Sequence, residues 1–92
     1  MIKKIKCTDT SALFQGKRVA RFANIAAVAE RKLQQIDCAE TLEALRSPPG
    51  NRLEALKGNR AGQHSIRIND QWRVCFRFEG GDAFDVEIVD YH

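Results

Sequence analysis

The chain has 92 residues, of which 43% are hydrophobic and 29% are charged, and its formal net charge at pH 7 is +3. This composition is typical of a soluble globular protein, and the length allows one domain, residues 1–92, with a single core. The first residues lack the apolar run of a signal peptide, and no later stretch is long enough to span a bilayer. The sequence therefore excludes a membrane protein and predicts a cytoplasmic one.

The cysteines and the acidic residues do not form a recognisable metal site. Cys7, Cys38 and Cys75 are odd in number and widely spaced, without a CxxC pair, so we expect reduced and mostly buried thiols. The acidic residues of 79–90 lie two or three positions apart, which indicates a solvated strand edge rather than a site for a divalent metal. We therefore expect neither a metal nor a cofactor.

Charge is unevenly distributed along the chain. Residues 1–22 hold six Lys or Arg and one acidic residue, and residues 46–78 hold seven basic and two acidic residues. Residues 79–92, in contrast, hold five acidic residues and no Lys or Arg. The cationic middle of the chain indicates a polyanionic partner, and a charged surface that is simply solvated is the alternative.

The first half of the chain predicts one strand followed by helices. Residues 2–7 alternate apolar and basic side chains, as a strand with one buried face does. A short helix begins at Thr8, and a longer helix follows Asn24, with apolar residues at helical spacing. Asp37 begins a further helix, because Glu40 follows it at the spacing of a capping box.

The second half predicts a loop and three strands. Two prolines and a glycine make 46–51 a loop. From His64 onward the apolar period is two, which predicts strands separated by turns at 69–70 and 80–81. The inward side chains are then Ile66, Ile68, Trp72, Val74, Phe76, Phe78, Phe84, Val86 and Ile88. The first hairpin needs an odd loop or a bulge to keep both strands' apolar residues on one face, because a two-residue loop would flip the register.

The order β-α-α-(α)-β-β-β, with consecutive tight hairpins, predicts an α+β fold. We expect a twisted, mainly antiparallel sheet, with the N-terminal strand and the helices packed on one of its faces. Trp72 lies in the apolar stripe of its strand and is therefore assigned to the core.

Several cations are expected on the uncovered face of this sheet and on the basic connection beside it. They are Arg52, Lys57, Arg60, Arg67, Arg73 and Arg77. Guanidinium groups bind phosphate through paired hydrogen bonds, and several together can stabilise the extra charge of a phosphoryl transition state. His64, near the start of a strand, either adds to this surface or is an ordinary surface histidine. No glycine-rich nucleotide-binding fingerprint is present.

The sequence ends on Asp90-Tyr91-His92, which combines groups that transfer protons. In a metal-independent ribonuclease reaction the ribose 2′-hydroxyl attacks the adjacent phosphorus. The protein supplies a base, an acid for the 5′ leaving oxygen, and cations for the developing charge. Histidine transfers protons near neutral pH, and a neighbouring carboxylate can orient it. The residues thus predict a small basic domain that acts on RNA.

Two stretches are specific in combination: RSPPGNRLEALKGNRAGQHSIRINDQWRVCF at 46–76 and VEIVDYH at 86–92. With them, and with the MIK start and the helical segment near LQQIDCA, essentially the whole chain resembles the HigB-type toxins of the RelE/ParE superfamily, also called plasmid maintenance system killer proteins. The resemblance implies an endoribonuclease, an mRNA interferase that depends on the ribosome. It would cleave messenger RNA in the A site of the 30S subunit and inhibit translation.

The resemblance also implies partners and residue roles. The neutralising partner would be a HigA-like helix-turn-helix antitoxin, and operator DNA would be contacted only through that antitoxin. Arg73 of QWR matches the arginine that stabilises the scissile phosphate, and Lys57 of LKG matches a functional lysine. Asp90, Tyr91 and His92 match the catalytic residues at the end of the chain. RNA or ribosome binding is then assigned to the remaining cations and the histidine: Arg52, Arg60, Arg67, Arg77 and His64.

One residue departs from the pattern of the family. Some relatives carry a histidine three positions before the lysine of LKG, where this chain has Glu54. This carboxylate either serves as a base or pairs with a neighbouring cation, and its presence shifts the expected acid/base role toward His92. Two other functions stay open on the sequence alone: a ParE-like inhibitor of DNA gyrase on the same fold, and a non-catalytic module that binds RNA or protein.

Overall fold

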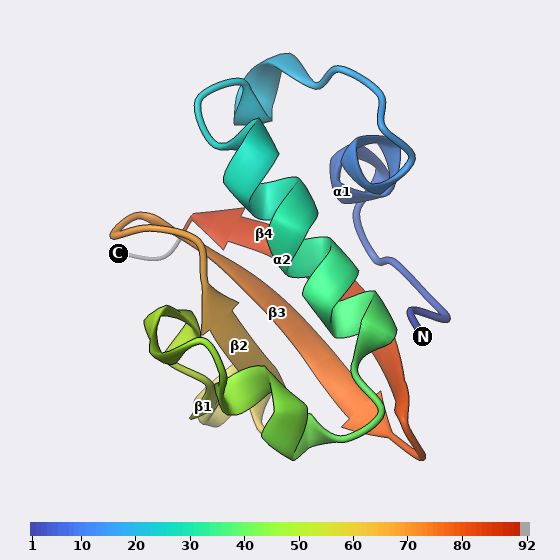
Figure 1. Cartoon of the computed structure of the whole chain (residues 1–92), viewed down its shortest axis with the longest axis vertical. Coiled ribbons are helices and arrows are strands. Elements are labelled where there is room, and N and C mark those ends of the chain that lie inside the picture. The colour runs from blue at the N-terminus through green and yellow to red at the C-terminus, as the bar shows by residue number, and fades with distance from the viewer. Residues whose placement is uncertain (91–92) are drawn as a thin grey trace.

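The computed structural model describes residues 1–90 and has the predicted α+β architecture (Figure 1). Two α-helices, α1 (Thr8–Phe14) and α2 (Ala26–Cys38), pack on a four-stranded antiparallel sheet. The strands, in the spatial order β1-β2-β3-β4, are β1 (Glu54–Ala55), β2 (His64–Arg67), β3 (Trp72–Glu79) and β4 (Asp82–Asp90). Four short 3-10 helices also lie within the described residues: η1 (Ala20–Phe22), η2 (Leu42–Arg46), η3 (Pro49–Asn51) and η4 (Gly58–Arg60).

The core lies between α2 and the sheet. Leu33 and Ile36 of α2, and Val74 and Phe76 of β3, are fully buried. Trp72 packs against this cluster, and its ring meets Phe22 edge to face at a centroid distance of 5.5 Å, so its assignment to the core is confirmed. Within residues 1–90 no helix is long and apolar enough to cross a membrane.

The helix predicted to begin at Asp37 is wrong. α2 continues through this residue to Cys38, and the Asp37 carboxylate accepts a hydrogen bond from the backbone N–H of Ile2 (2.8 Å) instead of capping a helix. The cap lies four residues later, where the Thr41 hydroxyl accepts from the Ala44 N–H (3.3 Å) at the start of η2. The capping-box spacing therefore did not decide where the helix begins, because the Asp37 carboxylate bonds the N-terminal segment instead.

The predicted N-terminal strand forms only two isolated bridges. Ile2 and Ile5 pair in parallel with Ala83 and Val86 of β4, and both isoleucines pack on the core. These two isoleucines are three positions apart, so the segment does not keep the alternation of a regular strand. Its backbone nevertheless forms hydrogen bonds with part of the outer edge of β4. For example, the Lys3 N–H donates to the Ala83 carbonyl (2.8 Å).

The β2–β3 hairpin has the odd loop that the apolar pattern requires. Ile66 pairs with Val74 and Arg67 with Arg73, and the Ile68 N–H donates to the Trp72 carbonyl, which leaves three loop residues at 69–71. The Asn69 side-chain oxygen accepts from the N–H groups of Gln71 (2.9 Å) and Trp72 (2.8 Å), as in an Asx turn. The predicted register is therefore confirmed.

A bulge in β4 overturns one predicted inward residue. Cys75 pairs with Glu87, but the next paired residues are Arg77 and Phe84, so β4 carries one extra residue here. Asp85 absorbs the bulge with a left-handed φ of 53°. Phe84 consequently lies on the uncovered face, where the Arg77 guanidinium lies 5.6 Å from the centre of its ring, and Ala83 takes the inward position.

Past the residues of β4 that the N-terminal segment contacts, a buried hydroxyl accepts a hydrogen bond from the outer edge of the strand. Thr10 of α1 is fully buried, and its Oγ1 accepts from the backbone N–H of Ile88 at 3.0 Å. Thr10→Val keeps the shape but leaves this N–H without its acceptor, so we expect a loss of about 1–3 kcal/mol in the free energy of unfolding by urea. Thr10→Ser, the control, keeps the acceptor and loses one methyl group, at about 1 kcal/mol.

Hydrogen exchange at the Ile88 amide separates the two variants. The exchange rate should rise in Thr10→Val beyond what its global stability explains, and should follow global stability in Thr10→Ser. Equal protection of Ile88 in both variants would contradict the role given to the hydroxyl.

Candidate functional site

The candidate site is the face of the sheet opposite α2, here called the open face. Strand alternation and cross-strand pairing place on it Glu54, Ser65, Arg67, Arg73, Cys75, Arg77, Phe84 and Glu87. Two rows of directly opposed residues cross it: Ser65, Cys75 and Glu87, and next to them Arg67, Arg73 and Val89. Residues in such rows are near neighbours, so the sheet gathers the predicted arginines of β2 and β3.

Arg73 is held by two different parts of the fold. Its Nε donates to the Ser65 hydroxyl (2.8 Å), and its Nη2 donates to the backbone carbonyl of Arg52 (2.8 Å). Ser65 is fully buried, whereas the bond to Arg52 lies at the exposed surface. The side chain thus runs from a buried anchor to the rim of the open face, and its charge is kept at the surface.

Ser65 and the Arg52 carbonyl were not predicted as parts of the site. A serine two residues before Arg67 on an alternating strand shares its face, so the sequence did contain a signal for Ser65. No sequence signal pointed to the carbonyl, because it depends on the left-handed conformation of Arg52, with φ 45° and ψ 56°.

The basic connection between η3 and β2 flanks the open face. Lys57 is exposed and, together with Glu54, lines a hollow of about 440 Å³ beside β1. Arg60 lies nearer the sheet, where its Nη1 donates to Glu87 (2.8 Å) and to Gln63 (3.1 Å). Glu54 pairs with Ser65 across β1 and β2, so this carboxylate lies on the same face as Arg73.

Arg77 differs from Arg73 in its partners. Its Nε donates to Asp85 (2.9 Å) and its Nη1 to Glu79 (2.8 Å), near the β3–β4 turn. The hydrogen bond from Arg77 holds the pKa of the Asp85 carboxyl below its ordinary value. Arg67 also has an acidic neighbour, because its Nη2 bonds the exposed Asp70 carboxylate in the hairpin loop. The cations of the open face are therefore partly neutralised, and most strongly at Arg77.

His64 is not brought together with the arginines. It shares the covered face with Ile66, and its ring centre is 6.4 Å from that of Phe76. Its Nδ1 is buried without a hydrogen-bond partner among residues 1–90. The assignment of His64 to RNA binding therefore receives no support from its position.

The predicted acid/base residues begin at the end of β4. Asp90 pairs with Trp72 and accepts a hydrogen bond from the Gln71 side chain (3.1 Å). This end of the sheet also carries the Arg67–Arg73 row, one pair away along the strands. Tyr91 and His92, the other two predicted residues, lie outside the described residues.

Cysteine burial agrees with the prediction only at Cys75. This thiol is fully buried on the open face; Cys38 is exposed and Cys7 is partly buried. Burial raises the pKa of Cys75, and the nearby Arg60 guanidinium acts in the opposite direction. A buried thiol with a raised pKa packs in the protein interior and does not act as a nucleophile. Across residues 1–90 no group of three His, Cys, Asp or Glu side chains is placed to hold a metal ion.

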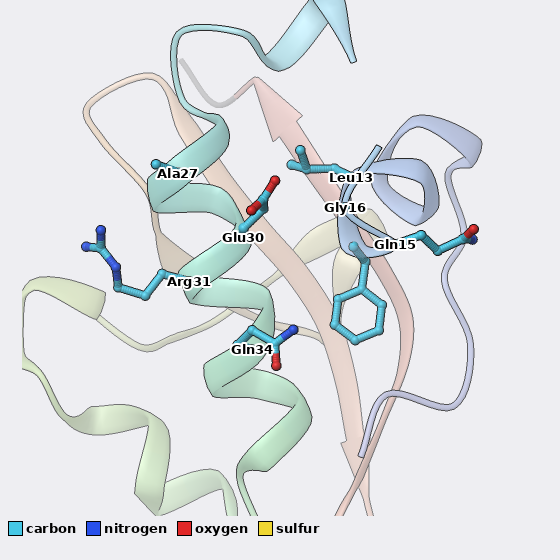
Figure 2. A pocket seen from close by; sticks show the side chains of 8 residues that line it. Leu13, Gln15, Gly16, Ala27, Glu30, Arg31 and Gln34 are labelled. Carbon is cyan, nitrogen blue, oxygen red and sulfur yellow. The ribbon is translucent and has the colours of Figure 1, made fainter. Parts of the chain in front are cut away.

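A second hollow, of about 420 Å³, lies between α1 and α2. Figure 2 shows the residues that line it: Leu13 and Phe14 at the end of α1, Gln15 and Gly16 directly after it, and Ala27, Glu30, Arg31 and Gln34 from α2. It belongs to the helical layer and contains none of the predicted site residues.

Comparison with known proteins relates the chain to bacterial toxins. The sequence model of the HigB-like toxin family, described as RelE-like toxins of type II toxin–antitoxin systems, matches residues 13–92. Toxin HigB-1 of Vibrio cholerae is 47% identical over 55 residues, which are 60% of this chain and 58% of that protein. Endoribonuclease HigB of Proteus vulgaris is 39% identical over 61 residues, 66% of this chain and 65% of that protein. The chain thus covers less than two thirds of each relative.

Solved structures with low sequence identity share the fold. A YoeB-YefM complex from Staphylococcus aureus contains a chain that superposes with a TM-score of 0.59 at 19% identity. The match covers 100% of the present chain and 95% of the other. A heterotetrameric YoeB-YefM complex from the same organism gives the same TM-score at 17% identity.

Proposed function

The chain belongs to the HigB-like family of RelE-like toxins, and from this premise we propose that it is a ribosome-dependent mRNA endoribonuclease. In this proposal the chain cleaves messenger RNA in the ribosomal A site and thereby inhibits translation. The observation that carries the proposal is Arg73, a guanidinium anchored on the open face near the end of the sheet from which the chain continues into Tyr91 and His92. The name of the Proteus vulgaris relative, an endoribonuclease, supports the same activity.

In the proposed reaction, groups of the protein and of the RNA itself carry out the bond-making and bond-breaking steps, on messenger RNA held by the ribosome. The ribose 2′-oxygen forms a bond to the adjacent phosphorus as its proton passes to a base, and the bond from phosphorus to the 5′-oxygen breaks as that oxygen receives a proton from an acid. The products are a 2′,3′-cyclic phosphate and a 5′-hydroxyl. Arg73 stabilises the negative charge that grows on the phosphoryl oxygens. His92 is the proposed proton carrier, and Glu54 is a second carboxylate on the same face.

The other cations bind the RNA backbone and the ribosome in this proposal. Lys57 and Arg52 are exposed beside the open face, and Arg67 lies opposite Arg73. Electrostatic contacts of this kind are independent of sequence and weaken with salt. Arg77 is expected to add least, because its two carboxylate partners already neutralise its charge.

The proposed neutralising partner is a HigA-like helix-turn-helix antitoxin, and operator DNA would be contacted only through it. Membership of a toxin–antitoxin family supports an antitoxin partner. The structures with the same fold are complexes of YoeB with YefM. A cytoplasmic location follows from the proposed target.

Replacing Arg73 tests the role of the anchored guanidinium. Arg73→Ala should lower the single-turnover rate of mRNA cleavage on programmed ribosomes by about 100- to 1000-fold, because losing one preorganised donor costs on the order of 3–4 kcal/mol in the transition state. The urea midpoint should change little, because the neighbours Trp72 and Val74 supply the core contacts. Arg31→Ala, on the exposed side of α2, is the matched control and should cleave normally.

Two results would overturn this assignment. An Arg73→Ala protein that cleaves at the wild-type rate would make the arginines of the open face ordinary surface charge. A wild-type protein that leaves mRNA intact but inhibits DNA gyrase would replace the proposed function.

Removing His92 tests the proposed proton carrier. A chain ending at Tyr91 should cleave about 100- to 10,000-fold more slowly at saturating protein, the usual contribution of general acid–base catalysis. The apolar anchors of β4, Val86 and Ile88, precede the deletion, so thermal stability and antitoxin binding should be retained. Asp90→Asn should have a smaller effect, because Asp90 is proposed only to orient or tune the imidazole. Cleavage at the full rate by the truncated chain would exclude His92 from the reaction.

A further inference from the structure

The carbonyl that holds Arg73 belongs to a loop fixed from behind by a buried side chain. Asn51, the residue before Arg52, is fully buried. Its Nδ2 donates to the carbonyls of Leu45 (3.1 Å) and Ser47 (3.3 Å) and to the side-chain oxygen of Gln35 (2.9 Å). One side chain therefore ties the loop to itself and to α2.

The fourth contact of Asn51 is with a buried ammonium group. Lys32 of α2 is only 9% exposed, and its Nζ donates to the Asn51 Oδ1. Burial lowers the pKa of Lys32 from its ordinary value. A buried lysine is costly unless its hydrogen bonds are made, so this contact strongly favours a single position of the Asn51 side chain.

These contacts form a continuous path to Arg73. Lys32 and Gln35 fix Asn51, Asn51 fixes the backbone that leads into Arg52, and the Arg52 carbonyl accepts from the Arg73 guanidinium. From the other side, the Ser65 hydroxyl accepts from Arg73 Nε. We propose that Ser65 and Asn51 are positioning residues for Arg73. This inference rests on the proposed function, in which Arg73 stabilises the phosphoryl transition state.

Fixing Arg73 is useful because arginine side chains are long and flexible. A guanidinium that samples several rotamers must be ordered during the reaction, and that ordering raises the barrier. Two bonds to two different parts of the fold, one from Nε and one from Nη2, define both the position and the plane of the group. A displacement of about 1 Å is enough to cost on the order of 100-fold in rate.

The test is single-turnover cleavage on programmed ribosomes at saturating protein, with each anchor removed in turn. Ser65→Ala removes one hydroxyl, and Asn51→Asp keeps an acceptor for Lys32 but cannot donate to the loop carbonyls. Each should slow cleavage by up to about 100-fold, depending on how far the guanidinium is displaced, with little change in ribosome affinity. Ser11→Ala, on α1, is the matched control: it removes a serine hydroxyl that also accepts one side-chain bond, from Gln15 just after the helix, and should leave the rate unchanged. If Asn51→Asp does not fold, Lys32→Met is measured in its place, because it removes the bond that Lys32 donates to Asn51.

A double-mutant cycle separates positioning from a general loss of structure. In an Arg73→Ala background, Ser65→Ala and Asn51→Asp should have no further effect on the rate, because the group that they position is gone. If either variant slows cleavage by the same factor with and without Arg73, the proposal is wrong for that residue. A Ser65→Ala variant that keeps Arg73 and cleaves at the wild-type rate would also overturn the proposal.

A measurement on the free protein distinguishes failure of this inference from failure of the proposed function. The Arg73 Nε–H should give a nuclear magnetic resonance signal protected from solvent exchange, and Ser65→Ala should remove the protection. If these results hold and the wild-type protein cleaves no RNA, the positioning stands and the proposed function fails. If the wild-type Nε–H is unprotected, or is unchanged by Ser65→Ala, the positioning is disproved whatever the activity.

Discussion

The three-residue hairpin loop at 69–71, between Ile68 and Trp72, is the constraint on which the site depends. It puts Ile66, Trp72 and Val74 on the face that α2 covers, and the same register puts Arg67 opposite Arg73 on the open face. A shift of one residue would exchange the two faces, burying the arginines and exposing the core. The energy of burying apolar side chains under α2 therefore also fixes the arrangement of charge on the other side of the sheet.

The second requirement is an ordered β4, because this strand leads to the last residues of the chain. Its outer edge is covered in two stages, first by the N-terminal segment, whose backbone bonds Ala83 and Val86, and then by the Thr10 hydroxyl at Ile88. An edge strand with unpaired N–H groups invites association with other chains. With this edge covered, β4 stays paired with β3 as far as Asp90, beside the row that contains Arg73.

The sequence predicted the features that a buried face imposes and missed those set by tertiary contacts. Alternation along β2 and β3 was enough to require an odd hairpin loop and to place Arg67 and Arg73 together. It failed in β4, because the bulge at Asp85 needs a left-handed conformation that no periodicity reveals, and Phe84 changed face as a result. Within the site, the arginine was predictable from its strand, but the Arg52 carbonyl depends on a backbone conformation fixed by Asn51.

In the proposed function, the open face promotes attack by the ribose 2′-hydroxyl on an adjacent phosphate. Its most direct test is the chemistry of the RNA ends produced by the purified chain on programmed ribosomes. We expect a 2′,3′-cyclic phosphate on the upstream fragment and a 5′-hydroxyl on the downstream fragment. A 3′-hydroxyl paired with a 5′-phosphate would show that water is the nucleophile and would contradict the proposed reaction, as would messenger RNA that stays intact.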